Sequence, residues 1–128
     1  MIVADTSALA AIIFRETDAA IIAARIALEK LVVVGAPTAF ELGLVVRKRL
    51  GRSAWPEVDL LLSRPNIRVQ PFGPEHVALA MDALVRFGGK PADLNYGDCM
   101  AYATAKALGA PLLFKGDDFV RTDIEPVL

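Results

Sequence analysis

The sequence predicts an α/β fold in which a mostly parallel sheet carries helices on both faces. Short apolar, β-rich runs alternate along the chain with segments of helical periodicity, an order typical of strand–helix–strand units. One of these runs, "LVVVG" at residues 31–35, is apolar throughout, as is common for parallel strands covered on both faces. The chain has 128 residues, 55% of them hydrophobic, and this size suits one compact domain over residues 1–128.

The first half of the chain is expected to open with a strand and a helix. "MIVAD" is β-rich and ends in an acid, and Thr6 or Ser7 can cap the helix "TSALAAIIF" that follows. Pro37 favours a helix start after the second strand, and Ser53 can cap the next helix. The expected elements are a strand at residues 1–5, helices at 6–14 and 17–29, a strand at 31–35, and helices at 37–50 and 53–62.

The second half is expected to continue the same alternation. "IRVQPF" at residues 67–72 predicts a third strand, and Pro74 opens a helix that lasts until Gly88. Asn95 can by itself cap the helix of "YGDCMAYATAKAL", and "PLLF" at residues 111–114 predicts a fourth strand. "IEPVL" at residues 124–128 predicts a short terminal strand.

Composition narrows the range of functions. The charges nearly cancel, 14 Lys and Arg against 15 Asp and Glu, so no broad basic surface is expected to hold nucleic acid by counterion release alone. Cys99 is the only cysteine, which excludes an internal disulfide and suits a reducing compartment. We expect no signal peptide and no membrane span, because charges such as Arg25 and Glu29 interrupt the apolar runs. The expected location is the cytoplasm.

Acidic side chains follow several of the expected strands. Asp5 comes directly after the first strand, and Glu41 is expected in the first turn of the helix after the second strand. Asp98 lies in the first turn of the helix that precedes the fourth strand, and Asp117 and Asp118 come just after that strand. Because ligands of parallel α/β sheets bind beyond the carboxyl ends of the strands, we expect these acids to gather at one sheet edge.

Each acid also has a purely structural interpretation. Asp5 can cap a helix, Asp98 can form a capping box with Asn95, and Asp117 or Asp118 can be an ordinary turn residue. Together, however, three or four carboxylates without matching Lys or Arg would repel one another strongly. A protein tolerates such a cluster when a cation holds it, so the pattern favours a metal site.

The available ligands indicate which metal. His76 is the only histidine and is expected at an exposed helical position, and Cys99 has no second thiol, so a His/Cys zinc site is excluded. Ligands that are all oxygen atoms favour Mg²⁺ or Mn²⁺. Carboxylates with a hard cation, and without a Ser–His pair or a reactive Cys, point to phosphoryl chemistry by a metal-activated water.

Four segments taken together resemble the PIN-domain family, and within it the VapC toxins of bacterial toxin–antitoxin pairs. These segments are "VADTSAL", "TAFELGLV", "LNYGDCMAYATAKALGAPLLF" and "KGDDFVRTDI", and the likeness covers nearly the whole chain. The resemblance implies a PIN-like three-layer sandwich with a five-stranded parallel sheet. It also implies a Mg²⁺-dependent ribonuclease, with Mn²⁺ as an alternative metal, that forms a homodimer and is silenced by a cognate VapB antitoxin.

The resemblance also assigns roles by position. It makes Asp5, Glu41, Asp98 and one acid of the C-terminal pair both catalytic residues and metal ligands. For the fourth acid, the pattern favours Asp118, with Asp117 as a substitute. Three further residues match supporting positions: Thr6 or Ser7 beside the first acid, and Asn95 before the third.

The implied reaction is hydrolysis of single-stranded RNA that leaves a 3′-hydroxyl and a 5′-phosphate. The candidates for binding flanking phosphates are Arg15, Arg47, Lys48, Arg49, Arg52 and Lys115. The implied antitoxin would lay an apolar helix or tail along the early helices, with an Arg side chain reaching the acids.

Two other classes of function are weighed against this one. A phosphotransfer enzyme of the haloacid-dehalogenase type needs a second acid two residues after the first, where this chain has Ser7. A PIN-like module that binds without cutting is disfavoured, because all four acid positions are filled.

Overall fold

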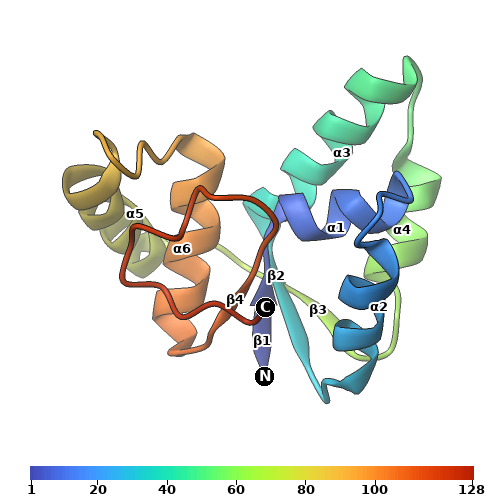
Figure 1. Ribbon diagram of the computed structural model, residues 1–128, viewed down its shortest axis with the longest axis horizontal. Helices are drawn as coiled ribbons and strands as arrows, with labels where there is room; N and C mark the ends of the chain where they lie inside the picture. Colours follow the sequence, from blue (N-terminus) through green and yellow to red (C-terminus); the bar gives the residue numbers. More distant parts are fainter.

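The computed structural model describes residues 1–128 and confirms the α/β class, with a parallel sheet between two layers of helices (Figure 1). The sheet has four strands in the order β3-β2-β1-β4, and all neighbouring strands are parallel. The strands are β1 (Ile2–Ala4), β2 (Val32–Gly35), β3 (Ile67–Gln70) and β4 (Leu112–Leu113). The carboxyl ends of β1 and β2 therefore meet at one edge of the sheet.

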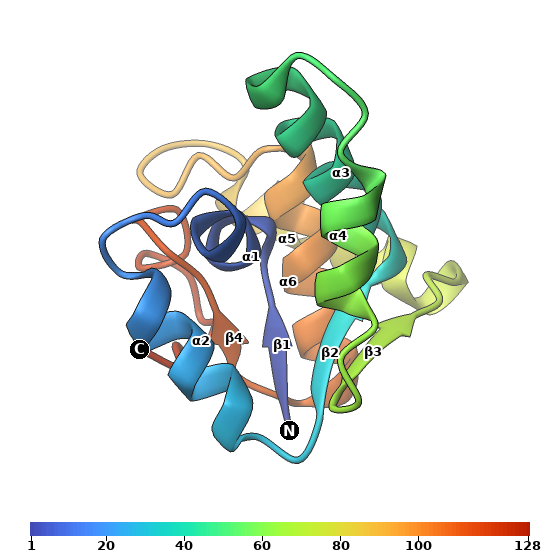
Figure 2. The same cartoon turned by 90° about the vertical axis from the view of Figure 1, so that its right-hand side faces the viewer.

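Six helices flank the sheet. They are α1 (Thr6–Ile13), α2 (Ala19–Leu28), α3 (Ala36–Leu50), α4 (Trp55–Leu62), α5 (Pro74–Phe87) and α6 (Tyr96–Leu108). Helices α1 to α4 cover one face of the sheet, and α5 and α6 cover the other (Figures 1 and 2). No helix is both long enough and apolar enough to cross a membrane.

Alternate residues of the strands face the two helical layers. In β1, Ile2 and Ala4 join the core under α1 to α4, whereas Val3 between them joins the core under α5 and α6. In β2, Val33 likewise faces the second core. This alternation is the period-two pattern of a strand, and it explains why both strands are fully apolar: each is buried on both faces.

The prediction of five strands is wrong by one. The segment expected as the fifth strand contributes one isolated parallel bridge, between Leu112 and Pro126. Leu112 donates to the carbonyl of Glu125 and accepts from Val127. The pairing cannot extend towards Ala110, because the amide of Ala110 is already bonded to the carbonyl of Ala105 at the end of α6.

Three local predictions need correction. The N-cap of α4 is Ala54 rather than Ser53, and α2 begins two residues later than expected. His76 is 4% exposed and not at an exposed position. His76 is the third residue of α5. Its Nδ1 accepts a hydrogen bond of 2.9 Å from the amide of Gly73, and its ring stacks on Phe72. The helix start therefore uses the histidine as a cap and buries it.

Candidate functional site

Asp5 lies at the junction of β1 and α1 and is 5% exposed. It is the N-cap of α1, a position expected for Thr6 or Ser7, and its Oδ2 accepts from both the amide and the hydroxyl of Ser7, at 3.1 and 2.6 Å. The Ser7 hydroxyl in turn accepts from the amide of Lys115, just after β4, at 3.0 Å. Ser7 therefore orients Asp5 and ties it to the neighbouring strand.

Glu41 projects from the second turn of α3 and not from the first turn as predicted, because this helix begins already at Ala36. Its Oε1 accepts a short hydrogen bond from the hydroxyl of Thr6. Its Oε2 lies against Gly97, where a β-carbon would be 1.8 Å from that oxygen. Position 97 therefore has to be glycine for Glu41 to lie beside the start of α6.

Asp98 lies in the first turn of α6 and is 7% exposed. Asn95 is the N-cap, as predicted, but it does not cap alone. Its side chain accepts from the amide of Asp98 at 2.9 Å, and Oδ2 of Asp98 accepts from the amide of Asn95 at 3.0 Å. This capping box fixes the carboxylate through one oxygen, and the other oxygen takes no part in it.

The charges of the four predicted acids act on one another through the pKa values of Asp98 and Asp5. The pKa of Asp98 is raised to about 6, mainly by burial and also by the negative charges of Asp118, Asp5 and Glu41, whereas the hydrogen bond from the Asn95 amide opposes the rise. Burial also raises the pKa of Asp5, an effect that the Ser7 hydrogen bonds oppose and the charge of Glu41 reinforces. In the C-terminal pair, the charge of Asp118 is one of the causes that raise the pKa of Asp98.

No basic side chain neutralises this group of acids. None of the four carboxylates forms an ion pair. Lys115, two residues after β4, pairs instead with Glu16 and Asp18, at 3.3 and 3.0 Å. The site therefore carries uncompensated negative charge partly removed from water, which favours the binding of a cation.

The donor set fits a hard divalent ion, although the carboxylates are not drawn together around one. No three of the acidic, histidine or cysteine side chains are close enough to hold one ion as they stand. Asp5 and Asp98 are buried and bonded to helix starts, whereas Asp118 is exposed and its side chain makes no hydrogen bond. All the donors are carboxylate oxygens, the ligands that Mg²⁺ and Mn²⁺ prefer.

Of the predicted phosphate-binding side chains, some are already engaged. Arg52 pairs with Glu57 at 2.7 Å, and Arg49 lies over the ring of Phe14 at 4.2 Å. Arg47 and Lys48 are exposed at the end of α3 and have no ion-pair partner. One further polar cluster, around Asp123, was not predicted from the sequence, because its members are a tyrosine and ordinary charged residues spread over three segments.

Comparison with known proteins identifies the family. The family model described as "PIN domain" matches residues 2–125. The chain is 38% identical to "Ribonuclease VapC" of Mycolicibacterium smegmatis over 127 residues, which cover 98% of each protein. Two solved structures with lower sequence identity share the fold. They are VapC20 of Mycobacterium tuberculosis, described as a "Sarcin-Ricin loop cleaving toxin", and a "Toxin-antitoxin complex from Klebsiella pneumoniae".

The structural agreement extends over almost the whole chain. The VapC20 structure has a TM-score of 0.81 at 18% identity, over 97% of this chain and 96% of its own. The Klebsiella structure has a TM-score of 0.73 at 14% identity, over 100% and 97%. The resemblance noted from the four sequence segments is therefore confirmed, and members of this family generally depend on a divalent metal. The chain belongs to the PIN-domain family, in its group of VapC ribonucleases.

Proposed function

We propose that this protein is a Mg²⁺-dependent endoribonuclease, with Mn²⁺ as an alternative metal, and the toxin of a toxin–antitoxin pair. One observation carries the proposal beyond family membership. Four carboxylates from separate elements act on one another at the carboxyl edge of the sheet, without any basic partner. We propose Asp5, Glu41, Asp98 and Asp118 as the metal ligands and catalytic residues, and favour Asp118 over Asp117 as the fourth acid because its charge acts on Asp98.

The roles of the side chains follow from how each is held. Asp5 and Asp98 are the rigid ligands, because each is buried and bonded to a helix start through Oδ2. Glu41 and Asp118 are the adjustable ones, and Thr6, Ser7 and Asn95 orient their neighbours. A divalent ion bound there would lower the pKa of a water and offset the charge that develops on the scissile phosphate.

Lys48 is placed to hold the RNA beside the acids. It lies seven residues after Glu41, so both lie on one face of α3, about 10 Å apart along the helix axis. This separation is close to that of phosphates one or two nucleotides apart. Lys48 and Arg47 also line a shallow hollow of about 460 Å³. We propose that Lys48 binds a phosphate that flanks the cleavage point.

The proposed antitoxin has an exposed apolar surface to bind, which we call the α3–α4 surface. It consists of Phe40, Leu44 and Trp55, which line a hollow of about 320 Å³. Phe40 is next to Glu41 in the chain, so an antitoxin segment seated here is close enough for an Arg side chain to reach the acids. Large exposed apolar patches are uncommon on monomers and mark partner sites.

A second apolar surface suits the proposed homodimer. A hollow of about 660 Å³ between α5 and α6 is lined by Val77, Met81, Leu84 and Tyr96, all of them exposed. It lies in the layer opposite α3 and α4, so the antitoxin and a second copy can bind together (Figure 1). We propose that the protein acts in the cytoplasm, where its proposed substrate, cellular RNA, is found. We also propose that residues 1–128 form a single domain.

The test is cleavage of unstructured and hairpin RNA by the purified protein. We expect cutting with Mg²⁺ or Mn²⁺, none with EDTA, and 5′-phosphate ends on the products. Metal-independent cleavage, or cyclic-phosphate ends formed by attack of the ribose 2′-hydroxyl, would contradict the proposed chemistry. Sequencing the 5′ ends of RNA from cells that express the protein would identify the target.

A further inference from the structure

Asp118 lies in a segment without a helix or a strand, yet its charge acts on Asp98. Residues 116–123 form bends and turns, and Asp118 is exposed and makes no hydrogen bond through its side chain. In Figure 1 this segment, in red, runs from the end of β4 across α6. Something other than regular secondary structure must hold Asp118 near the start of α6.

The segment is first anchored by the residue after Asp118. Phe119 is 2% exposed and packs on Phe114, with 5.1 Å between ring centroids. The hydroxyl of Thr122 donates to the carbonyl of Phe119 at 2.7 Å and accepts from the amide of Ile124 at 3.2 Å. These bonds connect the turn after Asp118 directly to the residues around position 123.

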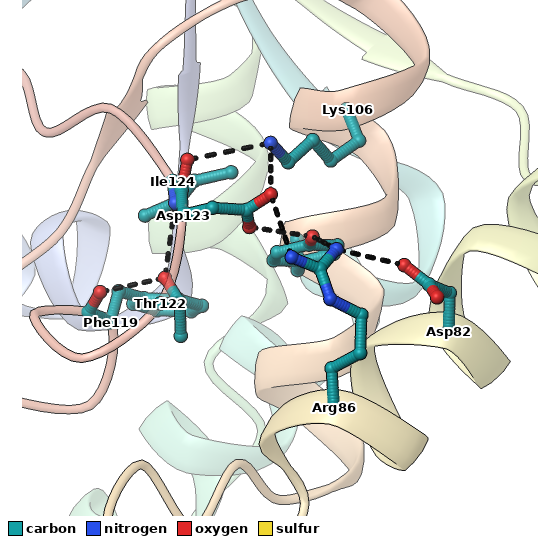
Figure 3. A network of polar contacts seen from close by, with 8 residues as sticks. Asp82, Arg86, Lys106, Phe119, Thr122, Asp123 and Ile124 are labelled. Carbon is teal, nitrogen blue, oxygen red and sulfur yellow. Dashed lines mark hydrogen bonds and ion pairs between the residues drawn. The ribbon is translucent and has the colours of Figure 1, made fainter.

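Asp123 then attaches the segment to two helices (Figure 3). Its Oδ1 accepts from the hydroxyl of Tyr102 at 2.7 Å, and its Oδ2 pairs with Lys106 at 2.9 Å and with Arg86 at 3.3 Å. Arg86 also pairs with Asp82 at 3.1 Å. We call these five residues the Asp123 cluster. It joins α5, α6 and the C-terminal segment.

The charges of the Asp123 cluster are well matched. Burial opposes ionisation of Asp123, but hydrogen bonds from Lys106 and Tyr102 and the charges of Lys106 and Arg86 lower its pKa to about 2. Burial and the bond to Asp123 raise the pKa of Tyr102 above its ordinary value, so the phenol remains a donor. The attachment therefore persists at every pH at which RNA would be cut.

Helix α6 connects this cluster to the acids. Asp98, Tyr102 and Lys106 are spaced four residues apart and lie along one face of the helix. Asp123 fixes the C-terminal segment to Tyr102 and Lys106, in the later part of this helix face. The charge of Asp118, in the same segment, acts on Asp98 at the start of the face. We propose that Asp123 is a positioning residue, which holds Asp118 opposite Asp98 for metal binding without touching the metal or the RNA.

This inference rests on the proposed function, because it assigns Asp123 a role in the metal site of that function. A role only in stability would leave metal affinity unchanged when the cluster is weakened. A positioning role predicts that metal affinity falls while the rest of the fold persists. Metal binding and local order are therefore the readouts, independent of RNA cleavage.

The experiment compares two variants with a matched control. Asp123→Asn removes the charge that pairs with Lys106 and Arg86, and Tyr102→Phe removes one hydroxyl but keeps the buried ring. Glu29→Gln is the control. Glu29 also pairs with an arginine, Arg25, at 2.6 Å, but this pair lies at the end of α2 and takes no part in the Asp123 cluster. Mn²⁺ binding would be measured by electron paramagnetic resonance of the free ion, and amide hydrogen exchange would report on residues 117–121.

We expect both variants to bind Mn²⁺ about tenfold more weakly than the wild type, as is typical when a residue that supports metal ligands is lost. Exchange at residues 117–121 should become faster, and Glu29→Gln should change neither quantity. If both variants bound Mn²⁺ as tightly as the control, the inference would be overturned. If Asp123→Asn does not fold, the result for Tyr102→Phe alone decides the question. A wild type that binds no Mn²⁺ would overturn the proposed function as well, so the two failures are distinguishable.

Discussion

Glu41 and Gly97 are in such close contact that a β-carbon at position 97 would lie 1.8 Å from Oε2 of the glutamate. Gly97 is on α6, next to Asp98, and Glu41 is on α3. The missing side chain of Gly97 lets these two helices bring their acids to the same edge of the sheet. The glycine inside "LNYGDC" is therefore a requirement of the site rather than of the helix.

Gly97→Ala should separate activity from stability. Alanine favours a helix over glycine by about 1 kcal/mol, and the obstructing atoms are at the flexible end of Glu41, so the fold should tolerate the change. The displaced carboxylate would lose its bond to Thr6 and its position beside Asp98. We expect a large loss of RNA cleavage with an unchanged or higher melting temperature.

Gly43→Ala is the matched control for that prediction. Gly43 is also helical, but no atom lies within 4 Å of the place where its β-carbon would be. We expect this variant to keep full activity. Equal activity of the two alanine variants would mean that the position of Glu41 is not critical.

Asp118→Asn and Asp117→Asn should differ sharply although they are neighbours. The charge of Asp118 acts on Asp98, so neutralising Asp118 should weaken metal binding and lower the turnover number by a factor on the order of 10 to 100. Asp117→Asn should behave as wild type. Titrating cleavage against Mg²⁺ concentration for both variants checks this. The reverse ranking would assign the fourth acid to Asp117.

The metal-free protein should become more stable as the pH falls from 7 to 5. The pKa of Asp98 is raised from 3.8 to about 6, so its favourable contribution is complete below pH 4 and is lost as the pH rises through 6. The raised pKa of Asp5 acts in the same direction. The difference between the pKa of Asp98 in the unfolded and folded states corresponds to a change of at most about 3 kcal/mol in the free energy of unfolding. Urea unfolding at several pH values in EDTA would measure the effect.

Two comparisons isolate the carboxylates in that experiment. Asp98→Asn keeps an oxygen that can accept from the Asn95 amide, so it should fold and should flatten the pH profile between 5 and 7. Saturating Mg²⁺ should stabilise the wild type at pH 7 and have little effect on Asp98→Asn. A wild-type stability that instead rises between pH 5 and 7 would show that these acids are not strained by their mutual charge.

Lys48→Ala should weaken RNA binding without changing the chemistry. Loss of one phosphate contact should raise KM, leave kcat nearly unchanged, and reduce the slope of log KM against log salt by about 0.7. Lys30→Ala is the control, because Lys30 is exposed just before β2, at the opposite edge of the sheet from Glu41. The same KM for both variants would remove Lys48 from the proposed RNA path.

Much of the fold follows from local patterns in the sequence. The apolar strands, the Asn95 cap and the order of elements are local signals, and the structure confirms them. Ser53 and His76 were assigned wrongly because cap choice depends on which side chain reaches the free amides after folding. The prediction of a terminal strand was wrong because the amide of Ala110, which would extend the pairing, is bonded to the carbonyl of Ala105 in α6.

Candidate site residues could be proposed from the sequence, but the contacts between them could not. The acids after strands indicated the carboxylate cluster, since strand ends are readable from sequence. The Thr6–Glu41 bond and the Asp123 cluster join residues far apart in the chain, and no periodicity reports such contacts. Similarly, the ion pairs of Lys115 with Glu16 and Asp18 could not be predicted, because these acids are far from Lys115 in the sequence.

Cleavage and metal binding by Asp5→Asn and Asp98→Asn, measured beside Asp59→Asn, address the carboxylate site itself. Asp59 is exposed on α4 and has no polar partner, so its variant controls for loss of one negative charge. We expect wild type and Asp59→Asn to bind Mn²⁺ and cut RNA, and both site variants to fold, bind Mn²⁺ weakly and not cut. Undiminished Mg²⁺-dependent cleavage by folded Asp5→Asn or Asp98→Asn would contradict a carboxylate metal site at this edge of the sheet.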